Sequence, residues 1–306
     1  MSTTSAHEML IGAHDRAEYF YMLVDPLAGY DEYARVGVPR LRESLGEEAL
    51  TVVERADLAH EPDSCPRLVA LSAPGMSPNV ELVDASIRYS EREARYDRRY
   101  VCGWLSSVEH PYSLAAYIAQ RCVVEINGAN RFIPFFEPVR LELLSAISTD
   151  DADVLRGPSS DWLYPNASGV VTRLPQAKTG AQRISETGLS VQAGAPWVVR
   201  LLAAWRTTQT DDLSYAPARW RGPGLLPPDA AARAYRQLLD ASSLGLTGFE
   251  DQLVFALHRL FIHPRLDAHP QVRSAIARAA AGEASLANQF ETFSDATWSQ
   301  IVASLL

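Results

Sequence analysis

The chain has 306 residues, enough for one large domain or two of ordinary size. Hydrophobic residues make up 47% and charged residues 21% of it, the proportions of a folded globular protein. The formal net charge of -9 repels phosphate backbones and anionic lipid headgroups, so we expect neither nucleic acid nor a membrane as a partner. The N-terminus has no basic start followed by an apolar core, and no apolar run approaches membrane-spanning length, which predicts a cytoplasmic protein.

The first part of the chain carries three short apolar runs after a tail at residues 1–18. The runs at 19–25, 50–57 and 66–71 are rich in β-branched or aromatic residues and end at turn residues. Each run therefore predicts a β-strand.

An amphipathic stretch at 77–100 predicts a helix, with Ser77 as its N-cap and Pro78 at its first position. Its charges mix in sign, as in Glu91 and Arg95, which are spaced to pair along a helix. Such mixing is typical of a solvated helix face rather than of a nucleic-acid patch.

The stretch from Cys102 to Pro138 contains a thiol, two adjacent serines, a histidine and two glutamates, the residue types of many active sites. Its pattern nevertheless predicts scaffold elements: a strand at 100–105, a helix at 110–120, a hairpin of 122–126 and 131–136, and a helix at 137–147. Asn127 and Gly128 tolerate the positive φ of a tight hairpin turn. The large apolar side chains available for the core of this layer are Trp104, Phe132, Phe135 and Phe136.

A nucleophilic serine needs a sharp elbow and a neighbouring base. Ser106 and Ser107 follow a strand, but no glycine comes after them. His110 lies at the expected start of a helix, where the helix dipole disfavours its protonation. Capping of that helix by Ser107 or Glu109 is the alternative role of these side chains.

The sequence predicts neither a metal nor a cofactor. His258 and His263 are five residues apart, about 140° around a helix, so they do not share a face. The acidic cluster at 150–153 lacks the central glycine and closing glutamate of a calcium loop, and the loop at Gly222 has prolines where a phosphate loop needs N–H donors. Three cysteines, at wide spacing, form neither a disulfide framework nor a zinc site and are expected to be buried and reduced: Cys65, Cys102 and Cys122.

Beyond Gly157 and Pro158 the chain is rich in Pro, Gly, Ser and Thr up to about Gly194, which is typical of a linker or an irregular lid. The rest is helical in pattern. We expect an α+β protein, with an N-terminal mixed α/β lobe whose small sheet is flanked by helices and an all-helical C-terminal lobe. The expected divisions are a tail at 1–18, an α/β adaptor domain at 19–174, a linker or irregular segment at 175–194 and a helical lobe at 195–306.

Several segments resemble, in their order, one known family. "YMLVDP" ends a strand at Asp25, "CPRLVAL" forms a later one, and "VCGWLSS", "PYSLAAYIAQ", "VVEINGANRF" and "PFFEP" follow as strand, helix, hairpin and aromatic run. This series is similar to the adaptor chaperones of type VI secretion systems, which match effectors to the valine-glycine-repeat (VgrG) spike. The resemblance covers about residues 19–165. Many members carry an arginine and an aspartate before the last proline, where this chain has Pro134 and Glu137.

The resemblance implies a non-enzymatic adaptor with two protein partners, a cognate effector and the VgrG spike. The positions that match the family signature are Asp25, Trp104, Ser106, Gly128, Phe135, Phe136, Glu137, Pro138, Gly157 and Pro158. Two other functions stay open from the residues themselves: an immunity-type protein that binds a toxin, and a hydrolase that uses Ser106 or Cys102.

Two apolar stripes in the helical half repeat every four residues. Each stripe suits either core packing within the lobe or a groove for a partner. The candidate partner-binding residues are Trp197, Leu201, Trp205, Leu253, Leu257 and Phe261. We expect the α/β lobe to engage the effector and the helical lobe to contribute to the spike contact or to close over the cargo.

Overall fold

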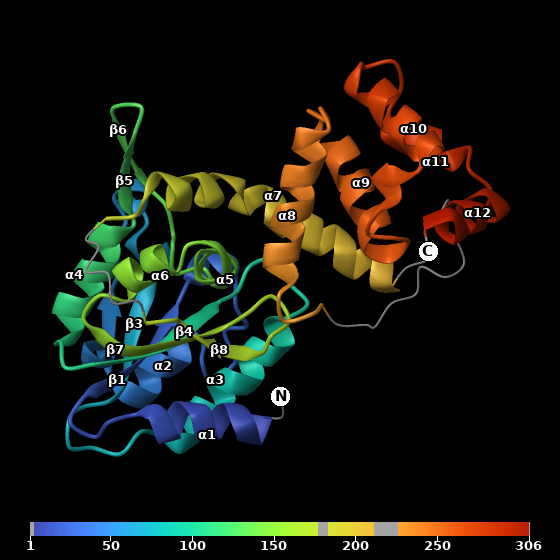
Figure 1. Ribbon diagram of the computed structural model, residues 1–306. Coiled ribbons are helices and arrows are strands. Elements are labelled where there is room, and N and C mark those ends of the chain that lie inside the picture. The colour runs from blue at the N-terminus through green and yellow to red at the C-terminus, as the bar shows by residue number, and fades with distance from the viewer. Residues whose placement is uncertain (1–2, 177–182, 211–225, 306) are drawn as a thin grey trace. The chain divides into compact units, whose positions relative to one another are not determined.

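The computed structural model describes residues 3–176, 183–210 and 226–305 of the chain. The chain divides into two compact units, residues 1–193 and residues 194–306. The N-terminal unit is built on a six-stranded antiparallel sheet with helices around it, and the C-terminal unit is helical (Figure 1). This architecture confirms the α+β class expected from the sequence.

The main sheet has the strand order β2-β3-β1-β4-β7-β8, and every neighbouring pair is antiparallel. Its strands are β1 (Tyr19–Val24), β2 (Leu50–Val52), β3 (Arg67–Ser72), β4 (Val101–Ser107), β7 (Ser159–Pro165) and β8 (Val171–Arg173). Three of the segments that resemble the adaptor family are therefore neighbours, since β1 lies between β3 and β4.

Helices cover both faces of this sheet (Figure 1). Those on one face are α1 (Thr3–Ala13), α2 (Val38–Leu45) and α3 (Val80–Glu93), and those on the other are α4 (Pro111–Arg121), α5 (Pro138–Ile147) and α6 (Thr149–Arg156). Strand β1 sends Phe20 and Met22 into the first core and Tyr21 and Leu23 into the second. Burial on both faces explains why β1 is apolar throughout instead of alternating.

A separate hairpin, β5 (Val123–Ile126) and β6 (Ala129–Phe132), projects from the N-terminal unit (Figure 1). Its turn residues Asn127 and Gly128 have φ values of 53° and 76°. Two consecutive positive φ values are the geometry of the tight turn that the Asn-Gly pair predicts, so the turn is confirmed. The second arm differs from the expected 131–136, because β6 spans Ala129–Phe132 and the chain leaves the hairpin before Phe135.

The segment expected as a tail is instead part of the fold. Helix α1 spans most of it, and Ala6 and Leu10 lie in the core of the N-terminal unit. Helix α3 also differs from expectation, because it begins at Val80 and not at Ser77. Asn79 is the N-cap, and its side-chain oxygen accepts a hydrogen bond of 3.1 Å from the Leu82 amide.

The stretch after Gly157, expected as a linker or lid, contains strands β7 and β8. All residues of β7 except Ser160 are buried. Its sequence, "SSDWLYP", has only three apolar residues between turn formers, so its local pattern gives little sign of a strand. Pairing with β4 makes this segment part of the sheet.

Among the residues that the structure describes, the C-terminal unit contains most of α7 (Glu186–Thr210), which begins within the segment expected as a linker, and five further helices. They are α8 (Ala230–Ser243), α9 (Phe249–Phe261), α10 (Pro270–Ala280), α11 (Leu286–Glu291) and α12 (Asp295–Leu305). Phe255, Phe290 and Trp298 are fully buried in its core, together with His258. Burial lowers the pKa of His258 to about 3, so this histidine is neutral in the folded protein.

Candidate functional site

Asp25 follows β1 and is 4% exposed. Its carboxylate accepts a hydrogen bond of 3.1 Å from the Leu27 amide and thereby caps a 3-10 turn (Pro26–Ala28). Burial raises the pKa of Asp25 to about 6, although the Leu27 amide and the charges of Arg55 and Arg98 act in the opposite direction. Asp25 therefore holds the chain as it leaves the sheet.

The aromatic run "PFFEP" packs in the core on the face of the sheet that α4, α5 and α6 cover. Phe135 and Phe136 are fully buried in the core with α4, α5 and α6. Pro138 lies at the start of α5, and Glu137 precedes it and pairs with Arg140 at 2.9 Å. These residues therefore have structural roles in the core and at the start of α5, and the two buried rings are not available to a ligand.

Trp104 is also fully buried, and its ring N–H donates a hydrogen bond of 2.9 Å to the Ser86 hydroxyl on α3. This bond satisfies the indole and joins the centre of the sheet to the helix that covers it.

Ser106 lies inside strand β4, paired with Phe20 on one side and Asp161 on the other. Its hydroxyl is 3.5 Å from Nδ1 of His14, and Nε2 of the same ring is 3.4 Å from the Ser72 hydroxyl. Burial lowers the pKa of His14. The position of His14 went unforeseen because the segment that carries it was expected to be a tail.

This serine and histidine lack the arrangement of a hydrolase triad. Each ring nitrogen of His14 faces a serine hydroxyl, so neither is turned to a carboxylate that would orient the ring as a base. Ser106 is paired within the sheet on both sides, with a register shift toward β7 directly after it, and does not sit on an elbow between a strand and a helix. Ser107 donates to the Pro158 carbonyl at 3.0 Å and accepts from the Glu109 amide at 3.1 Å, while His110 takes the N-cap position of α4.

The cysteine alternative meets a different obstacle. Cys102 and Cys122 are fully buried, and burial raises the pKa of both thiols, that of Cys102 well above its usual value and that of Cys122 to about 12. A nucleophilic cysteine needs the thiolate, which burial disfavours here. Cys65 is buried as well.

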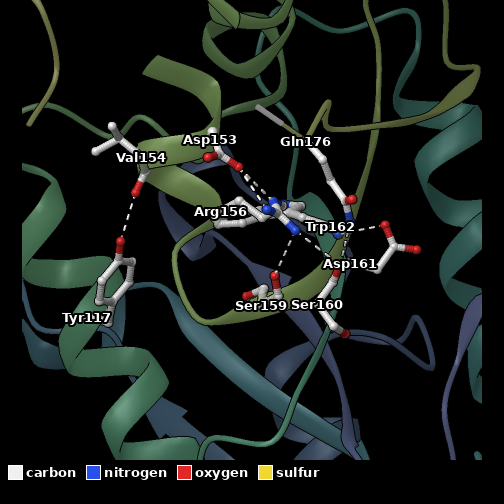
Figure 2. Close-up of polar contacts among 9 residues, drawn as sticks. All are labelled: Tyr117, Asp153, Val154, Arg156, Ser159, Ser160, Asp161, Trp162 and Gln176. Carbon is white, nitrogen blue, oxygen red and sulfur yellow. Dashed lines mark hydrogen bonds and ion pairs between the residues drawn. The ribbon is translucent and has the colours of Figure 1, made fainter. Parts of the chain in front are cut away.

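Gly157 and Pro158 lie in the turn between the end of α6 and the start of β7. The side chain of Arg156 bridges this turn, because it pairs with Asp153 at 2.8 Å and donates to the carbonyls of Ser159 and Ser160 at 3.3 Å (Figure 2). Tyr117 of α4 donates to the Val154 carbonyl at 2.8 Å. Signature positions 157 and 158 thus lie in a braced structural turn.

The two apolar stripes of the helical half meet at one pair of rings, Trp205 and Phe261, while Trp197 packs on Phe249, which precedes the second stripe. Trp197 contacts the ring of Phe249, with centroids 4.7 Å apart, and Trp205 contacts Phe261 at 6.4 Å. Leu201, Trp205 and Leu257 are buried, Leu253 and Phe261 are half-buried, and Trp197 is 44% exposed. Trp197 is therefore the member of these stripes with most of its surface open to a partner.

A surface groove of about 770 Å³ lies beside α3 and is basic in character. Four arginines line it against one acidic side chain: Arg35, Arg88, Arg92 and Arg95 against Glu91. The sequence predicts a solvated helix face here, and the mixed signs along α3 give no hint of the groove. Its basic character arises because the loop before α2 adds Arg35 and the α3 acids Glu81 and Asp84 do not line it.

Within the described ranges no three His, Cys, Asp or Glu side chains are grouped to hold a metal ion, and no helix combines the length and apolarity needed to cross a membrane. Comparison with models of protein families, with curated proteins and with solved structures finds no match.

Proposed function

We propose that this chain is a non-enzymatic, cytoplasmic adaptor chaperone that binds a type VI secretion effector and helps to load it onto the VgrG spike. The observation that carries the proposal is the way in which the resembling segments meet. Strands β1, β3 and β4 are adjacent in the sheet, and Phe135 and Phe136 pack in the core on one face of it. Segments spread over about 120 residues thus form one frame, as expected of a family scaffold.

The division of the chain into two units supports the same proposal. An adaptor must hold two different proteins, and each unit here has its own core and architecture. In this proposal the N-terminal unit engages the effector, while the helical unit contributes to the spike contact or to closure over the cargo. The chemistry around Ser106 and Cys102 favours a structural role for both, which supports an adaptor over a hydrolase.

The test is co-purification of the tagged full chain with the products of its neighbouring genes. We expect an effector and a spike protein to be retained together. Retention of a toxin alone, with loss of the toxin's activity, would instead support the immunity-type function.

Ser106→Ala separates the adaptor from the hydrolase. We expect this variant to fold and to retain both partners. The Ser106 hydroxyl that it removes makes a long contact of 3.5 Å with His14 and has no catalytic role in the proposed function. A folded Ser106→Ala protein that has lost function would contradict the proposal.

A further inference from the structure

The α3 groove contains arginines whose charges the chain does not itself neutralise. Arg35 pairs with Glu81 at 3.0 Å. Arg88, Arg92 and Arg95 are exposed, and no ion pair of theirs occurs among the residues that the structure describes. Three neighbouring positive charges repel one another, so a bound anion would relieve the repulsion.

Aromatic rings lie among these arginines. The guanidinium of Arg92 is 5.2 Å from the centre of the Tyr89 ring, and Tyr96, on the rim of the groove, is 65% exposed. Arginine and tyrosine together are typical of surfaces that bind proteins, because both combine a flat apolar face with hydrogen-bond donors.

The groove continues into two further hollows that follow α3. One of about 420 Å³ shares Tyr89, Arg92 and Tyr96 with it, and another of about 450 Å³ shares Arg35 and reaches the start of the helix at Leu82. The 14 residues of α3 span about 21 Å at 1.5 Å per residue. An extended chain covers that length with about six residues.

We propose that this trough binds an extended, acidic segment of a partner protein. Carboxylates suit exposed guanidinium groups, which hold them through two parallel hydrogen bonds. The length of the trough favours a peptide over a small anion, which would occupy only its centre. The net charge of -9 disfavours a long polyanion such as nucleic acid, whose charge extends far beyond the trough.

The flanks of the trough predict where the acidic residues of that segment lie. At the end near the start of α3, the arginines are already paired, Arg35 with Glu81 and Arg40 with Glu43 at 2.7 Å. At the other end the acidic side chains Asp31 and Glu93 line the hollow together with Arg92 and Arg98, so the charges there balance. The carboxylates of the partner segment therefore lie at its middle, beside α3.

The identity of the partner as an effector rests on the proposed function, whereas the binding of an acidic segment does not. The experiment uses the full chain and a fluorescein-labelled hexaglutamate peptide, with binding followed by fluorescence anisotropy at low salt. Arg88→Glu combined with Arg95→Glu reverses two exposed charges in the trough. Arg131→Glu, at an exposed position on β6 away from the trough, makes the same kind of change as a control.

We expect the double variant to bind the peptide at least about tenfold more weakly, and Arg131→Glu to bind it within about twofold of the wild type. Added salt should weaken the wild-type complex. Arg88→Ala and Arg95→Ala, which only truncate exposed side chains, supply the same test if the double reversal does not fold.

Several results would overturn the inference: no binding by the wild type, equal losses in the trough and control variants, tighter binding of oligothymidylate than of the peptide, or complete displacement of the peptide by millimolar inorganic phosphate. Peptide binding without effector co-purification would leave the trough standing and count against the adaptor. If the effector co-purifies but the double reversal leaves the peptide affinity unchanged, the adaptor function would stand and the trough would be wrong.

Discussion

Gly157 adopts a backbone conformation that residues with a side chain rarely adopt, with φ of 50° and ψ of -122°. A Cβ atom placed there would overlap the ring of Tyr117, whose hydroxyl is fixed by the Val154 carbonyl. Gly128 also has a positive φ, of 76°, but no heavy atom lies within 4 Å of the corresponding Cβ position. A substitution at Gly157 therefore introduces both backbone strain and steric overlap, whereas one at Gly128 introduces backbone strain alone.

We expect Gly157→Ala to lower the free energy of unfolding by about 3 kcal/mol, because strain and overlap act together. Gly128→Ala should cost about 1 kcal/mol, from strain alone. Urea denaturation of the two variants measures both values. Equal losses would show that the Tyr117 ring yields easily and that overlap contributes nothing.

Glu93 illustrates how a polar residue of α3 became part of the core. Its two carboxylate oxygens accept hydrogen bonds from the amides of Tyr100, at 2.7 Å, and Val101, at 3.1 Å. Burial nevertheless raises the pKa of Glu93 from 4.5 to about 7. Between these pH values the folded state binds more protons than the unfolded state, so stability falls as pH rises through this window.

Glu93→Gln should remove this contribution. We expect the wild type to lose on the order of 2 kcal/mol more than the variant between pH 4.5 and 7.5. The neighbouring substitution Glu91→Gln, on the groove side of α3, serves as the control and should keep the wild-type dependence. Denaturant midpoints measured across this pH range make the comparison, and parallel profiles for the wild type and Glu93→Gln would contradict the assignment.

At the scale of residues, the sequence predicts what local chemistry determines. Asn127 and Gly128 specify their turn, and Phe135 and Phe136 are apolar enough to predict their burial. The contacts of His14 depend on segments 58 or more residues away. The burial of Glu93 depends on the path that the chain takes after α3. No spacing in the sequence encodes either feature.

Among the elements, α7 contains Pro196, which has no amide to donate within the helix. The carbonyl that loses its partner is that of Gln192, four residues earlier. Arg140 of α5 donates to this carbonyl at 3.1 Å and also to the side-chain oxygen of Gln192 at 3.1 Å. The side-chain amide of Gln192 in turn donates to the Arg140 backbone carbonyl at 3.1 Å. The Arg140 side chain of α5 thus supplies the hydrogen-bond donor that Pro196 cannot supply within α7.

A double-mutant cycle tests this repair. Arg140→Met keeps the aliphatic stem and should cost about 2 kcal/mol, since it leaves the Gln192 carbonyl without its donor. In a Pro196→Ala background the cost should be smaller by about 1 kcal/mol, because the new amide can bind that carbonyl. Costs that are equal in the two backgrounds would show that Arg140 and Pro196 act independently.

Elements with a strong pattern were predicted correctly, and those formed by tertiary contacts were not. The helices at 111–121 and 138–147 begin at prolines as their sequences indicate. Strand β7 has too few apolar residues to be recognised alone and exists because β4 pairs with it. Helix α1 is not predicted because its large apolar residues, Met9, Leu10 and Ile11, are consecutive and do not repeat at helical spacing, although Leu10 is buried in the core.

For the molecule as a whole, the two units have separate cores, and a large truncation in one should act mainly on that unit. Trp104 and Trp298 are both fully buried, the first in the N-terminal and the second in the C-terminal unit. Replacement of either by alanine should cost about 3 to 5 kcal/mol in its own unit.

Hydrogen exchange measured by mass spectrometry locates these losses. We expect Trp104→Ala to speed exchange in the strands of the main sheet and to leave α9 to α12 close to the wild type. Trp298→Ala should have the reverse effect. Faster exchange throughout both units in either variant would show that they unfold together.

In the proposed function, this one chain brings two other proteins together. The direct measurement is retention of the neighbouring effector by the immobilised spike protein, in the presence and absence of this chain. The proposed function predicts that the effector stays on the spike only when the chain is present, and that all three elute as one complex. Equal retention of the effector without the chain, or a chain that binds neither protein, would contradict it.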